Sequence, residues 1–123
     1  MSSARLLLVE DNELNRDMLS RRLGRAGFET IIAEDGGRAM ELVLSENPAL
    51  VLLDMNLPVL DGWTVCERIR RTHGIEDTPI IALTAHAMQQ DRDRAMAAGC
   101  DDYATKPIDF PALLKKIRRL LDA

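Results

Sequence analysis

No apolar run in this 123-residue sequence approaches the roughly 20 residues that a membrane-spanning helix needs. The first residues, Met1 to Ala4, lead directly into an apolar run at 5–9 and lack the basic and extended apolar regions of a signal peptide. We therefore expect a cytoplasmic protein with no membrane partner.

The sequence also lacks an excess of basic residues. Lysine and arginine number 16 against 20 acidic residues, which gives a formal net charge of −4. A negative chain has no overall field that attracts polyanions, so we expect no direct binding of nucleic acid. Low-complexity tracts are missing as well, and the proportions of 46% hydrophobic and 29% charged residues are those of an ordinary globular protein. This composition excludes disorder.

Cysteine is scarce, and its spacing excludes the usual cysteine motifs. The two cysteines, Cys66 and Cys100, are too far apart in sequence for a zinc or redox motif. A chain of this length buries roughly two thirds of its unfolded surface and does not need a disulfide. We expect a single domain over residues 1–123, with its core at about 5–121 and both thiols reduced and packed.

Five segments rich in aliphatic or β-branched residues are typical of strands and lie at residues 5–9, 28–33, 50–54, 79–84 and 101–105. Each is followed by a segment with helical features. Leu14, Met18 and Leu23 are the apolar positions of the first helix, and Gly74 marks the end of the third.

The last two predicted helices differ in their apolar content. The helix at about 88–98 offers mainly methionine and alanine for burial, so we expect a weak anchor. The helix that Asp109 can cap is apolar along one whole face as far as Leu121. Alternating strands and helices require parallel strands, right-handed crossovers and helices on both faces of the sheet. The fold class is therefore α/β, a three-layer doubly wound domain with a five-stranded parallel sheet.

Parallel strands would bring five functional side chains to one edge of the sheet: Glu10, Asp11, Asp54, Thr84 and Lys106. Like charges 4 Å apart repel by about 1 kcal/mol in water and about 4 kcal/mol near a protein surface, so clustered carboxylates need a counter-charge. Carboxylate and carbonyl oxygens suit Mg²⁺, which also keeps waters for an oxygen-rich substrate such as phosphate.

A shielded aspartate at a strand end can act as a nucleophile and form an acyl phosphate, and Asp54 is the candidate. Phosphoryl transfer depends chiefly on positioning and on neutralising the equatorial oxygens. A metal ion, the Lys106 ammonium group, the Thr84 hydroxyl and backbone N–H groups could provide both.

Five short motifs in this order resemble the receiver domain of two-component response regulators over nearly the whole chain: Val9 to Asn12, Asp54 with Pro58, Asp61-Gly62, Thr84-Ala85 and Lys106-Pro107. The resemblance implies a flavodoxin-like fold with strand order 2-1-3-4-5 and five helices. It also implies a cis peptide bond between Lys106 and Pro107.

In that family, Asp54 would accept a phosphoryl group from a histidine kinase or a histidine phosphotransfer protein. By the same resemblance, Glu10, Asp11, Asp54 and the backbone carbonyl of Asn56 would hold Mg²⁺, with Mn²⁺ as a substitute. Thr84 and Lys106 would bond the phosphoryl oxygens, and Tyr103 would be the switch aromatic that moves with Thr84.

With a receiver filling the chain, we expect output through protein contacts rather than through a DNA-binding or enzymatic domain. The expected partner-binding surface comprises the last two helices and the strand of Tyr103. We expect a monomer or a weak phosphorylation-dependent dimer. The domain would not be an enzyme beyond its own phosphorylation and dephosphorylation. An alternative is the receiver module of a hybrid histidine kinase that acts as a phosphorelay intermediate.

Two rival classes are disfavoured. An aspartyl-nucleophile phosphatase needs a general acid, which Asn56 cannot be. A flavin or nucleotide module cradles phosphate in a glycine-rich turn, whereas the first turn here contains Glu10 and Asp11, which would repel phosphate. His86 is close in sequence to Thr84, and we expect it to face solvent. In the family that the sequence resembles, the positions of Asn56 and His86 flank the path of the hydrolytic water.

Overall fold

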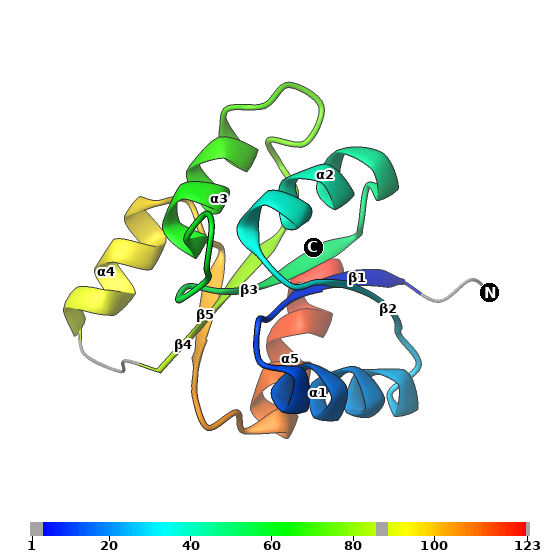
Figure 1. Ribbon diagram of the computed structural model, residues 1–123. Coiled ribbons are helices and arrows are strands. Elements are labelled where there is room, and N and C mark those ends of the chain that lie inside the picture. The colour runs from blue at the N-terminus through cyan, green and yellow to red at the C-terminus, as the bar shows by residue number, and fades with distance from the viewer. Residues whose placement is uncertain (1–3, 86–88, 123) are drawn as a thin grey trace.

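The computed structural model describes residues 4–85 and 89–122, and its strands and helices alternate without exception over these ranges (Figure 1). In chain order the elements are β1 (Arg5–Val9), α1 (Glu13–Arg25), β2 (Glu29–Ala33), α2 (Gly36–Glu46), β3 (Leu50–Asp54), α3 (Gly62–Arg70), β4 (Ile80–Thr84), α4 (Gln89–Ala97), β5 (Asp102–Thr105) and α5 (Phe110–Leu121). His86, whose exposure was predicted, and the predicted start of α4 at residue 88 lie outside the described residues.

The sheet has the order β2-β1-β3-β4-β5, and each neighbouring pair is parallel. The predicted fold class and strand order are confirmed. The chain leaves β1 for β2 on one side and returns to β3 on the other, so the strand order reverses between β1 and β3. In open α/β sheets this reversal opens a crevice at the carboxyl ends of the strands, which is where ligands bind.

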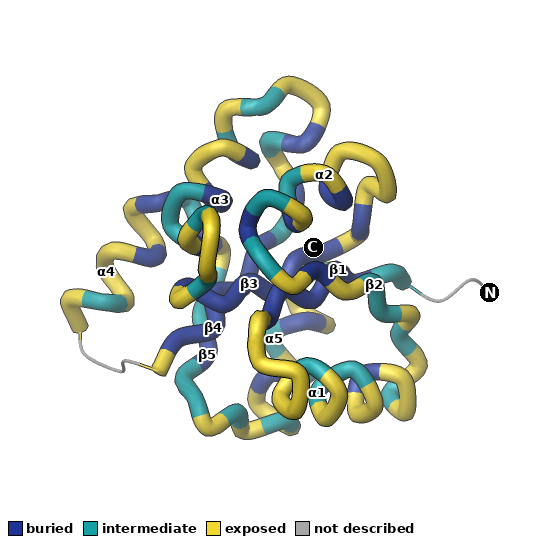
Figure 2. The backbone as a smooth tube through the Cα atoms, viewed as in Figure 1, coloured by how far each residue is buried: buried dark blue, intermediate teal, exposed yellow. Residues whose placement is uncertain are grey.

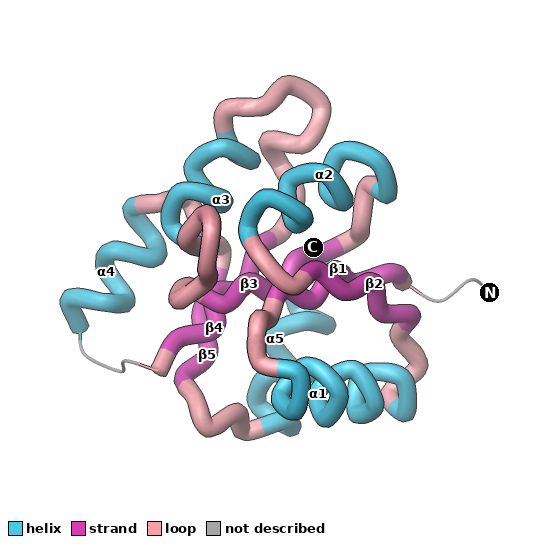
Figure 3. Tube along the Cα trace, viewed as in Figure 1, coloured by secondary structure: helices cyan, strands magenta, loops and turns pink. Residues whose placement is uncertain are grey.

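Two helical layers enclose the sheet (Figures 1 and 3). Leu7 and Leu53 belong to the core beneath α2, α3 and α4, whereas Leu8 and Leu52 belong to the core beneath α1 and α5. Successive strand residues point to opposite faces, so a strand covered on both sides needs a continuous apolar run. Figure 2 shows the result, because the central strands are buried along their length.

Several helix boundaries differ from the predicted ones. The α3 helix ends at Arg70 instead of Gly74, because the chain continues in single tight turns such as Thr72 N–H to Ile69 O at 3.2 Å. The pair Gly36-Gly37 would be expected to break the chain before a helix, but Gly36 is the first residue of α2, and the Asp35 side chain caps that helix. A Cβ atom on Gly36 would lie 2.0 Å from the carbonyl oxygen of Leu60, so the loop after β3 packs directly on this helix start.

The apolar positions of α1 were only partly predicted. Leu23 is fully buried, but Leu14 is 66% exposed and Met18 is 47% exposed. The C-terminal half of the helix packs on the sheet through Leu19 and Leu23, while its N-terminal half extends beside the acidic turn. The α4 helix has one buried residue, Ala95, among its described positions, in agreement with the predicted weak anchor. Within the described residues, no helix combines the length and apolarity needed to cross a bilayer.

The loop after β3 contains a strained residue. Val59 has a φ of +68° and is 85% exposed, and the Leu60 N–H donates to the Pro58 carbonyl at 2.7 Å, as in a γ-turn. Positive φ is unfavourable for a β-branched side chain and tolerable for asparagine.

We expect Val59→Asn to raise the free energy of unfolding by about 1 kcal/mol, because the strain is relieved and no buried contact is lost. Urea denaturation measures the change. Val59→Ala is the matched control, since alanine keeps a Cβ at the same φ and should gain less. Equal midpoints for Val59→Asn and the parent protein would contradict the assignment of strain.

Candidate functional site

Three charged side chains from distant parts of the sequence meet at the carboxyl edge of the sheet. Register pairs Val9 with Leu53, so that the following residues, Glu10 and Asp54, lie side by side. The Lys106 Nζ atom lies 3.0 Å from Glu10 Oε1 and 3.0 Å from Asp54 Oδ2. The side chains of Glu10 and Asp54 are only 3% and 4% exposed. Lys106 is thus the cation that compensates two buried carboxylates.

Backbone groups fix the orientation of this cluster. The Asn56 N–H donates to Asp54 Oδ1 at 3.0 Å, which leaves Oδ2 for Lys106. The Lys106 N–H donates to the Thr84 carbonyl at 2.7 Å, so the end of β5 stays beside the end of β4. The Lys106–Pro107 peptide bond is cis, as the resemblance implied. Each end of the Asp54 carboxylate therefore has its own partner.

Burial sets the protonation of the cluster. The pKa of Glu10 is raised to about 7 because burial, the largest cause, and the hydrogen bond with Asp54 together outweigh the opposing effect of Lys106. Burial lowers the pKa of Lys106, but the hydrogen bonds from its ammonium group to Asp54 and Glu10 outweigh this effect, so that the net shift is upward. The lysine therefore remains a cation while Glu10 holds a proton easily.

We expect the metal-free protein to lose stability as the pH rises from about 5.5 to about 7. The folded state raises the pKa of Glu10 above its unfolded value, so it binds more protons than the unfolded state in this range, and ionisation costs roughly 1 to 2 kcal/mol. Urea denaturation in the presence of a chelator, compared with Glu10→Gln, isolates this contribution. A difference between the two proteins that does not vary with pH would contradict it.

A divalent cation fits the acidic part of the cluster. Glu10, Asp11 and Asp54 each offer a carboxylate oxygen, and these oxygens lie within 4.8 Å of one another. Two oxygens on one octahedral Mg²⁺ ion at 2.0–2.1 Å are about 4.2 Å apart when they are opposite and about 3 Å apart when they are adjacent, so the carboxylates would have to draw closer together to share one ion. An all-oxygen set is the chemistry that Mg²⁺ prefers. Asp11 is exposed, which leaves the site open on its side.

The remaining predicted residues lie where their strands place them. Thr84 ends β4 and is buried at the same edge. Tyr103 lies two residues before the end of β5, away from the carboxylates. Its ring is between Arg92 of α4, whose Cζ is 4.4 Å from the ring centre, and Lys116 of α5, whose Nζ is 4.8 Å from it. Tyr103 therefore joins the last two helices instead of contacting the acidic cluster.

The sequence interpretation missed two contributors. Arg16 Nη1 donates to the backbone carbonyls of Glu10 at 3.2 Å and Asp11 at 3.4 Å, and so holds the acidic turn from α1. The Asn56 N–H was missed because only its carbonyl had been considered. Neither contribution could be recognised from the sequence, because an arginine in the first turn of a helix and a backbone N–H group are both too common to indicate a role in a site.

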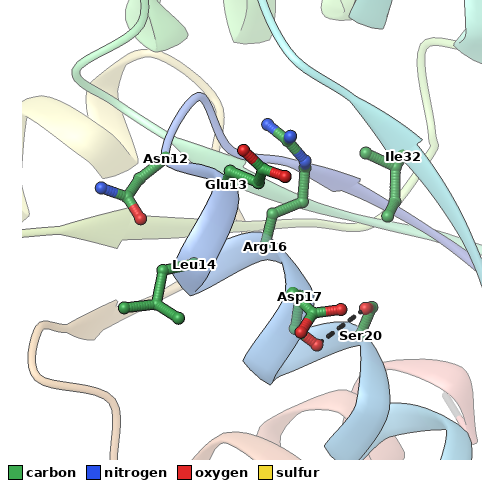
Figure 4. A pocket seen from close by; sticks show the side chains of 7 residues that line it. All are labelled: Asn12, Glu13, Leu14, Arg16, Asp17, Ser20 and Ile32. Atoms are coloured by element: carbon green, nitrogen blue, oxygen red, sulfur yellow. Dashed lines mark hydrogen bonds between the residues drawn. The ribbon is translucent and has the colours of Figure 1, made fainter.

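Hollows lie along α1, and one of them reaches the cluster. One of about 630 Å³ follows the exposed side of α1 and is lined by Asn12, Glu13, Leu14, Arg16, Asp17, Ser20 and Ile32 (Figure 4). The other, of about 610 Å³, reaches Glu10 and Lys106 and has an apolar wall that includes Met18, Pro107 and Ile108. The second hollow is the one that reaches the reactive groups, and an exposed apolar surface borders it.

A family model described as the response regulator receiver domain matches residues 6–118. The chain belongs to the response regulator receiver domain family. Receiver domains of two-component systems are signalling domains that act as phosphoacceptors and not classical enzymes.

Relatives of this receiver domain are attached to different outputs. It is 38% identical over 95% of its length to the DNA-binding dual master transcriptional regulator RpaA of Synechocystis sp., and it spans about half of that protein, 48%. A crystal structure of the receiver domain of sensor histidine kinase PA1611 from Pseudomonas aeruginosa, with a magnesium ion coordinated in its active site cleft, has a TM-score of 0.92 at 34% identity and covers 98% of this chain and 99% of that one.

A second similar structure is a complex. It contains the Saccharomyces cerevisiae histidine phosphotransfer protein Ypd1 and the receiver domain of its downstream response regulator Ssk1. The match has a TM-score of 0.86 at 32% identity, over 94% of this receiver and 87% of the matched chain.

Proposed function

We propose that this receiver is a phosphorylation-activated switch in which Asp54 accepts a phosphoryl group from a phosphohistidine donor. The observation that supports this most strongly is Lys106 Nζ, which lies 3.0 Å from an Asp54 carboxylate that is 4% exposed. Burying a carboxylate together with its cation costs desolvation free energy. We therefore expect this pair to serve in chemistry and not to stabilise the fold.

Asp54 attacks phosphorus as the donor P–N bond breaks, and one carboxylate oxygen becomes the ester oxygen of an acyl phosphate. The Asn56 N–H holds Oδ1 and Lys106 holds Oδ2, so the carboxylate is oriented before the donor arrives. Glu10, Asp11, Asp54 and the Asn56 carbonyl would hold Mg²⁺, which supplies charge neutralisation for the phosphoryl oxygens. Lys106 remains protonated, and its ammonium group can pair with the negatively charged phosphoryl oxygens.

Thr84 and Tyr103 would transmit phosphorylation to the surface. Thr84 shares the strand-end edge with Asp54, and its carbonyl already accepts from the Lys106 N–H. A hydroxyl drawn toward the phosphoryl group would move the start of α4, which has little burial to resist the movement. Tyr103 packs against both α4 and α5, so the output surface that we propose comprises these two helices and β5.

The donor would approach over α1. Met18 is an exposed apolar residue that lines the hollow reaching Glu10 and Lys106, and Leu14 is exposed one turn earlier on the same helix. A receiver of similar fold has been solved with a histidine phosphotransfer protein, which supports a protein donor of this kind. We propose that the domain works in the cytoplasm, as a monomer or a weak phosphorylation-dependent dimer.

Phosphorylation by two donors tests this function. Wild-type protein with Mg²⁺ should be phosphorylated by acetyl phosphate and by a phosphorylated histidine phosphotransfer domain, and Asp54→Asn should be phosphorylated by neither. Met18→Glu should keep its rate with acetyl phosphate and lose at least tenfold with the protein donor, because a charge now lies on the docking face.

Phosphate incorporation is measured by intact mass, with Mn²⁺ as a substitute for Mg²⁺ in a parallel series. Leu44→Glu on α2 is a matched control, because it also replaces an exposed apolar residue with glutamate and lies away from the hollow. Incorporation into Asp54→Asn would contradict the assigned acceptor. An equal loss with both donors in Met18→Glu would contradict the docking role while leaving the acceptor assignment intact.

A second candidate is the receiver module of a hybrid histidine kinase that acts as a phosphorelay intermediate. The similarity to the receiver domain of a sensor histidine kinase favours it. A relay intermediate passes its phosphoryl group on, so the phosphorylated domain should transfer it to an unphosphorylated histidine phosphotransfer domain within minutes. Loss to water alone would favour the terminal switch.

A further inference from the structure

The two cysteines meet inside the molecule although they lie 34 residues apart in sequence. Cys66 is on α3, and Cys100 follows Gly99 in the turn that leads from α4 to β5. Their Sγ atoms are 3.4 Å apart, with the Cys100 thiol donating to the Cys66 sulfur, and both residues are buried. Nothing in the phosphoryl-transfer site uses this pair.

The distance places the thiols close to bonding range. A disulfide has its sulfur atoms 2.03–2.05 Å apart, so the pair needs to close by about 1.4 Å. One side of the pair has room to adjust, because the described part of α4 buries only Ala95 and the turn after it contains Gly99 at a φ of +105°. The other side is fixed by the core contacts of α3.

We propose that Cys66 and Cys100 are an oxidant-sensitive dithiol that a peroxide converts into an intramolecular disulfide, joining α3 to the residues just before β5. This modification site does not depend on the function proposed for Asp54.

The local charges identify the attacking thiol. The hydrogen bond from Cys100 lowers the pKa of Cys66 against the effect of burial, Arg70 lowers it further, and Asp101 and Glu67 oppose this change. The same hydrogen bond, together with burial, raises the pKa of Cys100. Cys66 is therefore the group that becomes a thiolate, and Cys100 is the resolving thiol.

The reaction balances with one peroxide. The Cys66 thiol gives up its proton, the thiolate attacks one oxygen of hydrogen peroxide, the O–O bond breaks, and the departing hydroxide takes up a proton, so that the products are a sulfenic acid and one water. Cys100 sulfur then attacks the Cys66 sulfur, displaces the hydroxyl group as a second water and forms the S–S bond. Two thiols lose two electrons, and the two peroxide oxygens gain them.

The disulfide would add a covalent restraint to a region that hydrogen bonds already hold. It links α3 directly to the turn between α4 and β5, whose position already depends on Arg70 Nε donating to the Gly99 carbonyl at 2.9 Å. Local opening of this turn would then have to move α3 as well. The backbone amides of residues 95–101 should exchange hydrogen at least tenfold more slowly in the oxidised protein.

Oxidation of the folded full chain tests the proposal. Protein reduced and then treated with graded hydrogen peroxide should lose two hydrogen atoms in its intact mass and all alkylatable thiols, remain a monomer on a non-reducing gel, and recover both thiols with dithiothreitol. Peptide mapping should find Cys66 linked to Cys100. Asp54→Asn should oxidise like the wild type, which separates this result from the phosphorylation tests.

Single substitutions identify the order of the steps. Cys100→Ser keeps Cys66 and should accumulate a sulfenic acid that dimedone traps, whereas Cys66→Ser should give at least tenfold less adduct. Two free thiols remaining after the exposed Met96 has become a sulfoxide would overturn the proposal and leave two packed apolar cysteines. A disulfide that forms only between two molecules, or only in urea, would also overturn it.

Discussion

Gly62→Ala is expected to lower the free energy of unfolding by about 3 kcal/mol and to slow phosphorylation of Asp54 by acetyl phosphate. A Cβ atom on Gly62 would lie 2.6 Å from the carbonyl oxygen of Asp54 and 2.6 Å from the Cα of Met55. Both neighbours are backbone atoms at the end of β3, so they cannot rotate away as a flexible side chain could. The added methyl group must displace the strand end that orients the acceptor.

Denaturation in urea and the rate of phosphate incorporation measure the two effects. Gly24→Ala is the matched control, because Gly24 is also helical and a Cβ atom there would have nothing within 4 Å. That change should leave phosphorylation unchanged and raise stability by up to about 1 kcal/mol. If Gly62→Ala and Gly24→Ala behave alike, the close packing of α3 on β3 is not what positions Asp54.

Arg70→Ala is expected to cost about 4 kcal/mol of unfolding free energy, which is large for a side chain outside the reactive cluster. Arg70 is 22% exposed and donates to three backbone carbonyls: Gly99 at 2.9 Å, Glu76 at 3.0 Å and Thr78 at 2.6 Å. It also bonds Asp101 Oδ2 at 2.8 Å, and the same oxygen accepts the Ile80 N–H. Removing the guanidinium group would take this donor from the three carbonyls, while Asp101 would keep only the Ile80 N–H.

Arg71→Ala controls for loss of charge, since Arg71 is the next residue in sequence and is exposed. Arg70→Lys should recover less than half of the loss, because an ammonium group cannot match the planar set of donors. Urea denaturation gives the free energies. A cost below about 1 kcal/mol for Arg70→Ala would show that water replaces the guanidinium group at these carbonyls.

The strand ends were the most predictable part of the site. Glu10 and Asp54 each follow an apolar run, Lys106 follows the short strand Asp102–Thr105, and parallel strands bring their carboxyl ends to one edge whatever the order of the strands. Local sequence therefore sufficed to group these residues. Local sequence could not predict that the Lys106 ammonium group lies 3.0 Å from both carboxylates, because this contact depends on the register of β5 against β4.

Surface exposure was the least predictable. Leu14, Met18 and Leu23 share helical spacing, yet only Leu23 is buried. Spacing says which residues lie on one side of a helix, but not how far a neighbouring element extends to cover them. The contacts of Tyr103 could not be predicted for the same reason, because Arg92 lies on α4 and Lys116 lies on α5.

The sequence by itself determined the alternation of strands and helices, the parallel sheet and the residue types at its carboxyl edge, because apolar periodicity and chain direction are local properties. Only the tertiary structure decided that Arg70 ties two loops together, that Cys66 and Cys100 lie 3.4 Å apart, and that α1 exposes apolar residues beside the acidic cluster. These contacts join residues far apart in the chain, and their distances follow from how the layers pack.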